Sequence, residues 1–277
     1  MAVRNIKLTL SYDGSDYHGW QIQPEKRTIQ GILTEAIQNL VGCEVQVFGA
    51  SRTDAGVSAL GQVALVQIDS PIPTENLARA ITHRLPPDIA VTEAVEVPQG
   101  FDVISAVKSK LYRYTIFTGT VRPVLQIRHC WHLPAPLEIP QKELEPQKGR
   151  FLTGPEKLNI RAMAEAAKML IGKKDFKSFA AAADQRENTV RTIFRCNVTS
   201  DGDWVYVDVE GDGFLYNMVR NIVGTLVEIG KGRPAATMRR HGEWKPEKMR
   251  EIIKVCDRTA AGPIAPAQGL CLMWIKY

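Results

Sequence analysis

The order of the hydrophobic periodicities in the first hundred residues limits the fold of this chain more than any other feature. Apolar residues alternate over 6–12, which predicts a strand, and a helical apolar stripe follows over 29–40. Thr28 is suited to cap the start of this helix, and Gly42 is suited to end it. The chain therefore begins with a strand followed by an amphipathic helix.

The same patterns continue to residue 97. Strands are predicted at 45–47 and 62–68, and a second helix follows Thr74. Pro86 and Pro87 break that helix before a fourth strand at 89–97. The resulting β-α-β-β-α-β order is typical of a ferredoxin-like fold, in which an antiparallel sheet carries both helices on one face.

The second half of the chain repeats this theme with insertions. Its expected strands and helices lie at 111–117, 157–171, 190–198, 204–210, 214–229, 246–257 and 270–277. We therefore expect an α+β fold of two ferredoxin-like halves, whose antiparallel sheets flank a central cleft. The predicted domains are 1–105 and 106–277, with a surface insertion near 134–157 that is rich in proline and charge.

Composition excludes several classes of protein. The five cysteines are scattered without a CxxC pair, so we expect neither a disulfide framework nor a zinc site. His129, Cys130 and His132 lie close together, but no second group of metal ligands accompanies them. No signal peptide or membrane span is indicated, and a cytoplasmic protein is expected. Phosphate-binding glycine loops and a Gly-x-Ser-x-Gly elbow do not occur.

The stretch ASRTDAGVSALGQV, residues 50–63, places Arg52 and Asp54 among small residues between two apolar runs. Glycine and alanine there allow close approach by a ligand or by another backbone. An aspartate in such a loop commonly serves the turn itself. The alternative is a carboxylate held ready for chemistry, and the loop alone leaves both interpretations open.

Two further groups of residues suit a polyanionic ligand. Alternation places Lys110, Tyr112 and Tyr114 on one face of a strand, where aromatic rings can stack on bases; an ordinary half-buried strand would look the same. Arg220 lies mid-helix among apolar residues, so it needs an anionic partner or a route to water. The net charge of +5 is compatible with such a ligand. A basic run near the C-terminus contains Arg233, Arg239 and Arg240.

Taken in order, the segments YDGSDYHGWQIQP, GASRTDAGVSALGQV, KLYRY, GFLYNMVRNIVGTL and AGPIAPAQGL resemble the TruA family of tRNA pseudouridine synthases. The resemblance covers nearly the whole chain, from residue 5 to residue 277. It implies a homodimer that converts uridines 38, 39 and 40 of the tRNA anticodon stem-loop to pseudouridine, without cofactor or metal. The central cleft would then bind RNA.

The resemblance also implies roles for particular residues. Asp54, in the RTDAG motif, corresponds to the catalytic aspartate, and Tyr112 to the tyrosine that contacts the target base. Arg52 and Arg220 correspond to arginines of the substrate site. The expected RNA contacts are Lys110, Arg233, Arg239 and Arg240.

Three positions depart from the family pattern. Ser58 stands where histidine is usual, and Ile22 and Ile104 stand where basic residues are usual. Because Asp54 is retained, activity is still expected. The loss of two cationic side chains is expected to alter RNA affinity or the choice among adjacent uridines.

Two other functions are compatible with parts of this pattern. An RNA-binding protein of the RRM type shares the β-α-β-β-α-β order, but it would carry an aromatic RNP1 motif that neither half contains. A synthase fold retained only to assist RNA folding would tolerate loss of the aspartate. The presence of Asp54 with Arg52, Tyr112 and Arg220 favours an enzyme.

Overall fold

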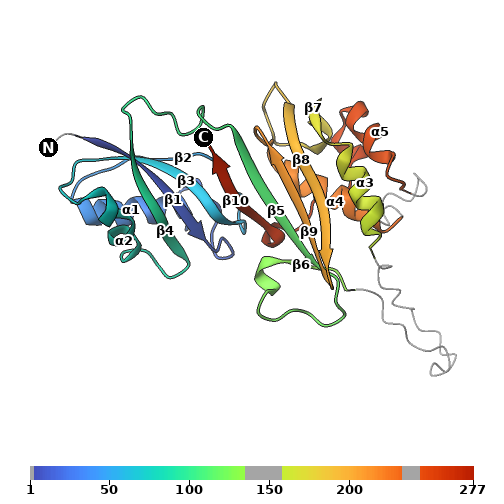
Figure 1. Ribbon diagram of the computed structural model, residues 1–277, viewed down its shortest axis with the longest axis horizontal. Coiled ribbons are helices and arrows are strands. Elements are labelled where there is room, and N and C mark those ends of the chain that lie inside the picture. The colour runs from blue at the N-terminus through green and yellow to red at the C-terminus, as the bar shows by residue number, and fades with distance from the viewer. Residues whose placement is uncertain (1–2, 135–157, 233–243) are drawn as a thin grey trace. The chain divides into compact units, whose positions relative to one another are not determined.

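The computed structural model describes residues 3–134, 158–232 and 244–277, which form two compact units (Figure 1). The first unit contains Met1–Arg113, Glu210–Gly213 and Leu270–Tyr277, and the second contains Tyr114–Val209 and Phe214–Gly269. The predicted insertion near 134–157, except for residue 134, lies outside the described residues, as do Arg233, Arg239 and Arg240.

The first unit is a mixed α+β structure built on a sheet. Its elements are β1 (Arg4–Tyr12), α1 (Ile29–Val41), β2 (Val47–Gly49), β3 (Ser58–Ile68), α2 (Thr74–Thr82), β4 (Ile89–Val97), the first part of β5 (Ser109–Phe117), and β10 (Leu270–Lys276). Within it the strand order is β4-β1-β3-β10-β5, and β2 also pairs with β3. β1 is antiparallel to β3 and β4, whereas β10 runs parallel to β3.

Helix α1 begins and ends where the sequence predicts. The Thr28 side chain accepts a hydrogen bond from the Gly31 N–H, which satisfies one of the unpaired donors of the first turn. Gly42 closes the helix with a φ of 75°, a left-handed conformation that glycine adopts without strain. The buried stripe includes Leu33 and Ile37. Local sequence therefore determines this helix.

Strand β3 is covered on both faces. Val63 and Leu65 pack on one face into a cluster with Ala50 and Val103, and Tyr277 contacts the edge of that cluster. The alternate residues of β3 point to the opposite face and are buried too. This explains why the strand is almost continuously apolar rather than alternating.

The second unit is also α+β. Its remaining elements are β6 (Trp131–His132), α3 (Ile160–Lys168), β7 (Gly172–Asp175), β8 (Val190–Asp201), most of β9 (Trp204–Gly211), α4 (Met218–Gly230) and α5 (Lys248–Val255). Short 3₁₀ turns occur at Ile127–His129, Lys177–Phe179, Arg258–Ala260 and Ala267–Gly269. The strand order within this unit is β5-β9-β8-β7, with β6 beside β5.

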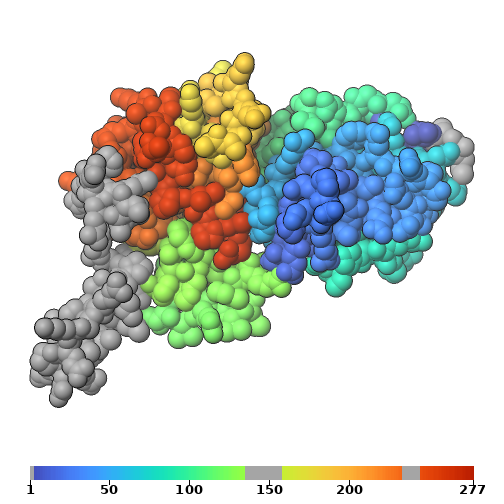
Figure 2. Space-filling view, turned by 180° about the vertical axis from the view of Figure 1, so that it is seen from behind, coloured from blue at the N-terminus to red at the C-terminus, as the bar shows by residue number. Residues whose placement is uncertain are grey.

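Helix α4 is the central helix of the second unit. It is buried from residue 221 to residue 230, and α3 packs against it. Residues 118–134, coloured light green in Figure 2, lie on the surface of this unit, and β6 within them pairs with β5. No helix within the described ranges combines the length and apolar character needed to cross a membrane.

A loop of the second unit provides a test of acid stability. Asp184 accepts hydrogen bonds of 2.7 Å from the Arg186 guanidinium and from the Tyr216 N–H. The Arg186 hydrogen bond is the main cause that lowers the pKa of the Asp184 carboxyl to about 2, against 3.8 for an unperturbed aspartate. A depressed carboxyl pKa stabilises the fold above pH 4, and the contribution disappears as the pH falls to about 2.

We therefore expect Asp184→Asn to be less stable than the parent protein at pH 6, with a gap that narrows between pH 4 and pH 2. Urea unfolding at pH 6, 4 and 3 measures this difference. Asp201→Asn, at an exposed position, serves as the control. A gap of the same size at all three pH values would show that the carboxylate charge is not responsible.

Candidate active site

Asp54 lies in the loop between β2 and β3, and its side chain is half-buried. The segment between β1 and α1 holds this loop by backbone hydrogen bonds. The Trp20 N–H donates to the Thr53 carbonyl at 3.0 Å, and the Gly56 N–H donates to the Tyr17 carbonyl at 3.2 Å. The backbone on both sides of Asp54 is therefore fixed by groups close to it in space but distant in sequence.

Two glycines allow this close approach. A Cβ at Gly14 would lie 2.0 Å from the Val57 carbonyl oxygen, and one at Gly19 would lie 2.6 Å from that of Thr53. Gly19 also has a φ of 88°, which side chains rarely tolerate. The Gly14 N–H donates to Ser58 Oγ at 3.1 Å, so the serine that departs from the family pattern also helps to join the two segments.

A buried polar network supports the loop from the side of the sheet. The hydroxyls of Tyr12 and Thr53 share a hydrogen bond of 2.8 Å. Gln62 is completely buried, and its Nε2 donates to the Ser51 carbonyl at 2.7 Å. Each of these groups would lose free energy if it were buried without a partner, so the network favours one loop conformation.

We expect Gln62→Leu to destabilise the protein by about 1–3 kcal/mol, because it leaves the Ser51 carbonyl without its donor. Catalytic activity should fall as well, because the network holds the loop that carries Asp54. Urea unfolding and an activity assay measure the two effects. Gln67→Leu is the matched control, because Gln67 lies on the same strand but is exposed. Equal stability of the two variants would contradict this role for Gln62.

Strand β5 brings two predicted residues to the same loop. The hydroxyls of Tyr112 and Ser51 share a hydrogen bond of 3.0 Å. Lys110 Nζ donates to the Ala50 carbonyl at 2.7 Å and to Ser51 Oγ at 3.3 Å. Lys110 therefore contacts the base of the Asp54 loop directly.

The electrostatics link Tyr112 with Asp54. Burial raises the pKa of Tyr112 to about 12; the negative charge of Asp54 contributes to the rise, and the hydrogen bond with Ser51 opposes it. The phenol is consequently protonated at neutral pH. Only 5% of Tyr112 is exposed, so a base can meet only a small part of its ring in this conformation.

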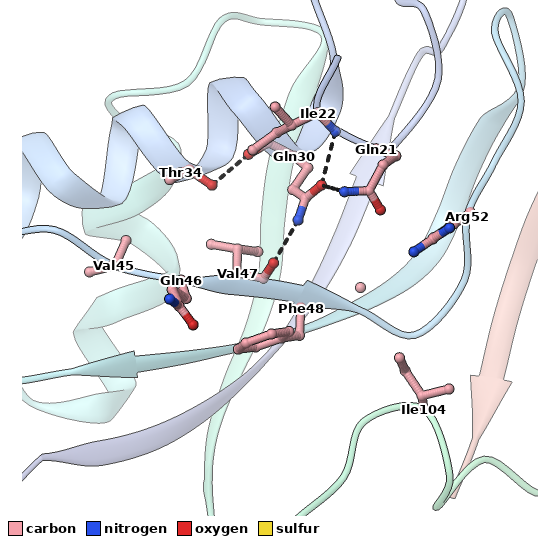
Figure 3. Close-up of a pocket in the computed structure, with 11 residues that line it drawn as sticks. Gln21, Ile22, Gln30, Thr34, Val45, Gln46, Val47, Phe48, Arg52 and Ile104 are labelled. Atoms are coloured by element: carbon pink, nitrogen blue, oxygen red, sulfur yellow. Dashed lines mark hydrogen bonds between the residues drawn. The ribbon is translucent and has the colours of Figure 1, made fainter. Parts of the chain in front are cut away.

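Arg52 lines a pocket beside the loop, as Figure 3 shows. The pocket has a volume of about 410 Å³ and lies along β2. Ile22 and Ile104, at which the resemblance implied basic residues, line the same pocket. Positions 82 residues apart in the sequence thus contribute to one surface.

Arg220 belongs to the second unit, on α4. Its Nε donates to the Ala265 carbonyl at 2.8 Å, and its Nη1 donates to Asn217 Oδ1 at 3.0 Å. A Cβ at Gly224 would lie 1.7 Å from the Pro263 carbonyl oxygen, so the AGPIAPAQGL segment packs directly on the helix. These two hydrogen bonds hold the guanidinium against α4 and the segment that follows it.

Sequence reasoning missed the residues that support the loop. Tyr12 lies in the segment YDGSDYHGWQIQP, and Ser51 and Gln62 lie in GASRTDAGVSALGQV, but the sequence assigned a role to none of the three. The sequence offered one indication of a structural role for Gln62, because it is a polar residue at the start of a predicted apolar strand. Among the described residues, no group of three or more His, Cys, Asp or Glu side chains has the arrangement of a metal site.

Comparison with known proteins identifies the class. The family model of the tRNA pseudouridine synthases matches residues 9–104 and 166–277, which is most of the chain and includes the Asp54 loop. The chain therefore belongs to the tRNA pseudouridine synthase family, whose members are isomerases.

Individual relatives point to one branch of that family. The chain is 41% identical to the tRNA pseudouridine synthase A of Moorella thermoacetica, over 98% of this chain and 99% of the relative. It is 38% identical to the enzyme of the same name from Thermoanaerobacter sp. strain X514, over 99% and 100%. A chain in a crystal structure of a Cbf5-Nop10-Gar1 complex is only weakly similar, with a TM-score of 0.30 and 13% identity over 80% of this chain and 54% of that chain.

Proposed function

We propose that this protein isomerises uridine to pseudouridine at positions 38, 39 and 40 of the tRNA anticodon stem-loop, with Asp54 as the catalytic carboxylate and no cofactor. The observation that carries the proposal is the Asp54 loop itself. Backbone contacts and a buried polar network hold it, and Asp54 acts electrostatically on Tyr112. Full-length similarity to tRNA pseudouridine synthase A supports the choice of tRNA as substrate.

The reaction requires an ionised carboxylate but no redox partner. The N1–C1′ bond breaks, the base turns, and C5 forms the new bond to C1′, while C5 loses a proton and N1 gains one. Asp54 can act as a nucleophile at C1′ or at C6, or as a base at C2′. Each of these steps uses the carboxylate, and none of them consumes an external reagent.

Tyr112 contacts the target base in this proposal. With its pKa at about 12, the phenol reaches the base as a neutral hydroxyl. It can therefore take the C5 proton only if it passes its own proton on, and its Ser51 partner at 3.0 Å offers a path. The uridine must leave its stack to reach this site, as bases do in other enzymes that act on them.

The other cations have supporting roles in this proposal. Arg52 and Arg220 bind the substrate, while Lys110 both contacts RNA and holds the Asp54 loop through its bonds to Ala50 and Ser51. Arg233, Arg239 and Arg240 contribute phosphate contacts, which bring affinity without sequence specificity. We further propose a cytoplasmic homodimer with two ferredoxin-like halves flanking an RNA-binding cleft.

Nucleotide-resolution mapping of pseudouridine tests this function. Unmodified tRNA transcripts that carry a uridine at only one of positions 38, 39 or 40 are incubated with the protein. Pseudouridine at each of these positions, and at no uridine outside the anticodon stem-loop, is the expected result. Product elsewhere would refute the assigned positions. Tight binding without any product would favour the RNA-binding alternative.

A further inference from the structure

The pocket along β2 combines exposed apolar side chains with one cation. Phe48 is 47% exposed, Ile22 is 51% exposed and Ile104 is 61% exposed. Arg52 is exposed at the same pocket, and no aspartate or glutamate lines it. Exposed apolar patches of this kind mark binding sites when polar groups surround them.

The arrangement of the side chains suits a flat aromatic ligand. In the view of Figure 3, Ile22 lies above strand β2, whereas the Phe48 ring and Ile104 lie below it. The volume of about 410 Å³ falls within the range of roughly 300–1,000 Å³ that is usual for small-molecule sites. The pocket is therefore large enough to hold one planar ring beside Phe48.

The polar groups suit the remaining parts of a nucleotide. Gln30 is occupied, because its Nε2 donates to the Val47 carbonyl at 2.7 Å and its Oε1 accepts from Gln21 Nε2 at 2.8 Å. Gln46 is exposed, and its amide offers both a donor and an acceptor for a base edge. The Arg52 guanidinium complements a phosphate.

The position of Arg52 in the chain connects this pocket with the proposed catalytic residue. Arg52 lies two residues before Asp54, on the same loop. A nucleotide held at Arg52 would therefore be a near neighbour of the uridine at Asp54. A protein partner would gain nothing from this proximity, whereas an RNA substrate gains orientation of the target base.

We propose that this pocket binds one unpaired nucleotide of the RNA substrate, close to the target uridine, with its base stacked on Phe48 and its phosphate on Arg52. The inference rests on the proposed function and adds a specificity site to it. Ile104, on the same side of β2 as the Phe48 ring, adds apolar contact to the base, so recognition depends on stacking more than on charge. Stacking tolerates any base, so the site selects an unpaired nucleotide rather than a sequence.

Removal of the aromatic ring tests the proposal. Phe48→Ala should weaken binding of an unmodified tRNA transcript about 10- to 100-fold, and KM should rise more than kcat falls. Phe48→Trp should bind within a few fold of the parent protein, because the ring is restored. Phe194→Ala is the matched control, since Phe194 is 49% exposed on β8 and does not line the pocket, and it should leave binding unchanged.

A substrate series identifies the nucleotide. Transcripts with one abasic site at successive positions of the anticodon loop are bound to the parent protein and to Phe48→Ala. One abasic position should weaken binding to the parent protein and have no further effect on the variant, which shows that ring and base interact.

Three outcomes would overturn the inference. Unchanged tRNA affinity in Phe48→Ala would exclude stacking at this pocket, even if the parent protein makes pseudouridine normally. Stacking at this pocket would also be excluded if the effects of Phe48→Ala and of every abasic site on tRNA binding were simply additive. Sedimentation velocity could show that Phe48→Ala breaks up oligomers of the chain. If tRNA affinity fell in proportion to the loss of oligomer, the pocket would bind a second copy of the chain instead. Absence of product from the parent protein would instead refute the proposed function.

Discussion

Asp54→Asn is expected to lower the rate of pseudouridine formation by about 10³-fold or more at saturating tRNA, because the amide can act neither as a nucleophile nor as a base. The asparagine is nearly isosteric, so the loop contacts through Thr53 and Gly56 should persist. Binding of tRNA should remain within a few fold of the parent protein, since the change removes a negative charge next to a polyanion. Single-turnover rates and filter binding measure the two quantities.

Asp201→Asn is the control for this change, because it makes the same substitution at an exposed position in the second unit. It should alter neither rate nor affinity. A rate for Asp54→Asn close to that of the parent protein would mean that Asp54 serves the turn only, as aspartates in glycine-rich loops commonly do.

Gly14→Ala is expected to have the second large effect. The added methyl carbon would lie 2.0 Å from the Val57 carbonyl oxygen, so one of the two backbones must move. Overpacking of this kind destabilises a protein by about 1–3 kcal/mol. Displacement of the loop by about 1 Å would also lower the rate about 100-fold, because Asp54 moves with it.

The control is Gly100→Ala, because a Cβ at Gly100 would meet nothing within 4 Å. Urea unfolding and single-turnover rates are measured for both variants. If Gly14→Ala matched Gly100→Ala in stability and in rate, the segment after β1 would not fix the position of the Asp54 loop, and this part of the account would fail.

The parts of the fold set by local sequence could be predicted. Helix α1 has its cap at Thr28, its end at Gly42 and an apolar stripe, and each of these signals acts within a few residues. Strand β7 was not expected, because its sequence, GKKD, is polar and short. Pairing with β8 determines that strand, and a pattern in one segment does not show its partner.

The sequence patterns also did not predict contacts between segments that are distant in the chain. Strand β10 pairs in parallel with β3, where Cys271 lies opposite Ser58, and no periodicity reports such a pairing. The sequence indicated Asp54 and Tyr112 through motifs, but it did not indicate that Ser51, within the Asp54 motif, bonds to Tyr112. In the same way, Ile22 and Ile104 stood out only as two separate substitutions.

The release of tritium from C5 tests the central claim most directly, because isomerisation replaces the C5–H bond of uridine by the C5–C1′ bond. A tRNA transcript made with [5-³H]uridine is incubated with the parent protein and with Asp54→Asn. The account predicts that the parent protein releases one tritium for each pseudouridine formed and that Asp54→Asn releases essentially none. Release of tritium by both proteins at similar rates, or by neither while both bind the transcript, would contradict it.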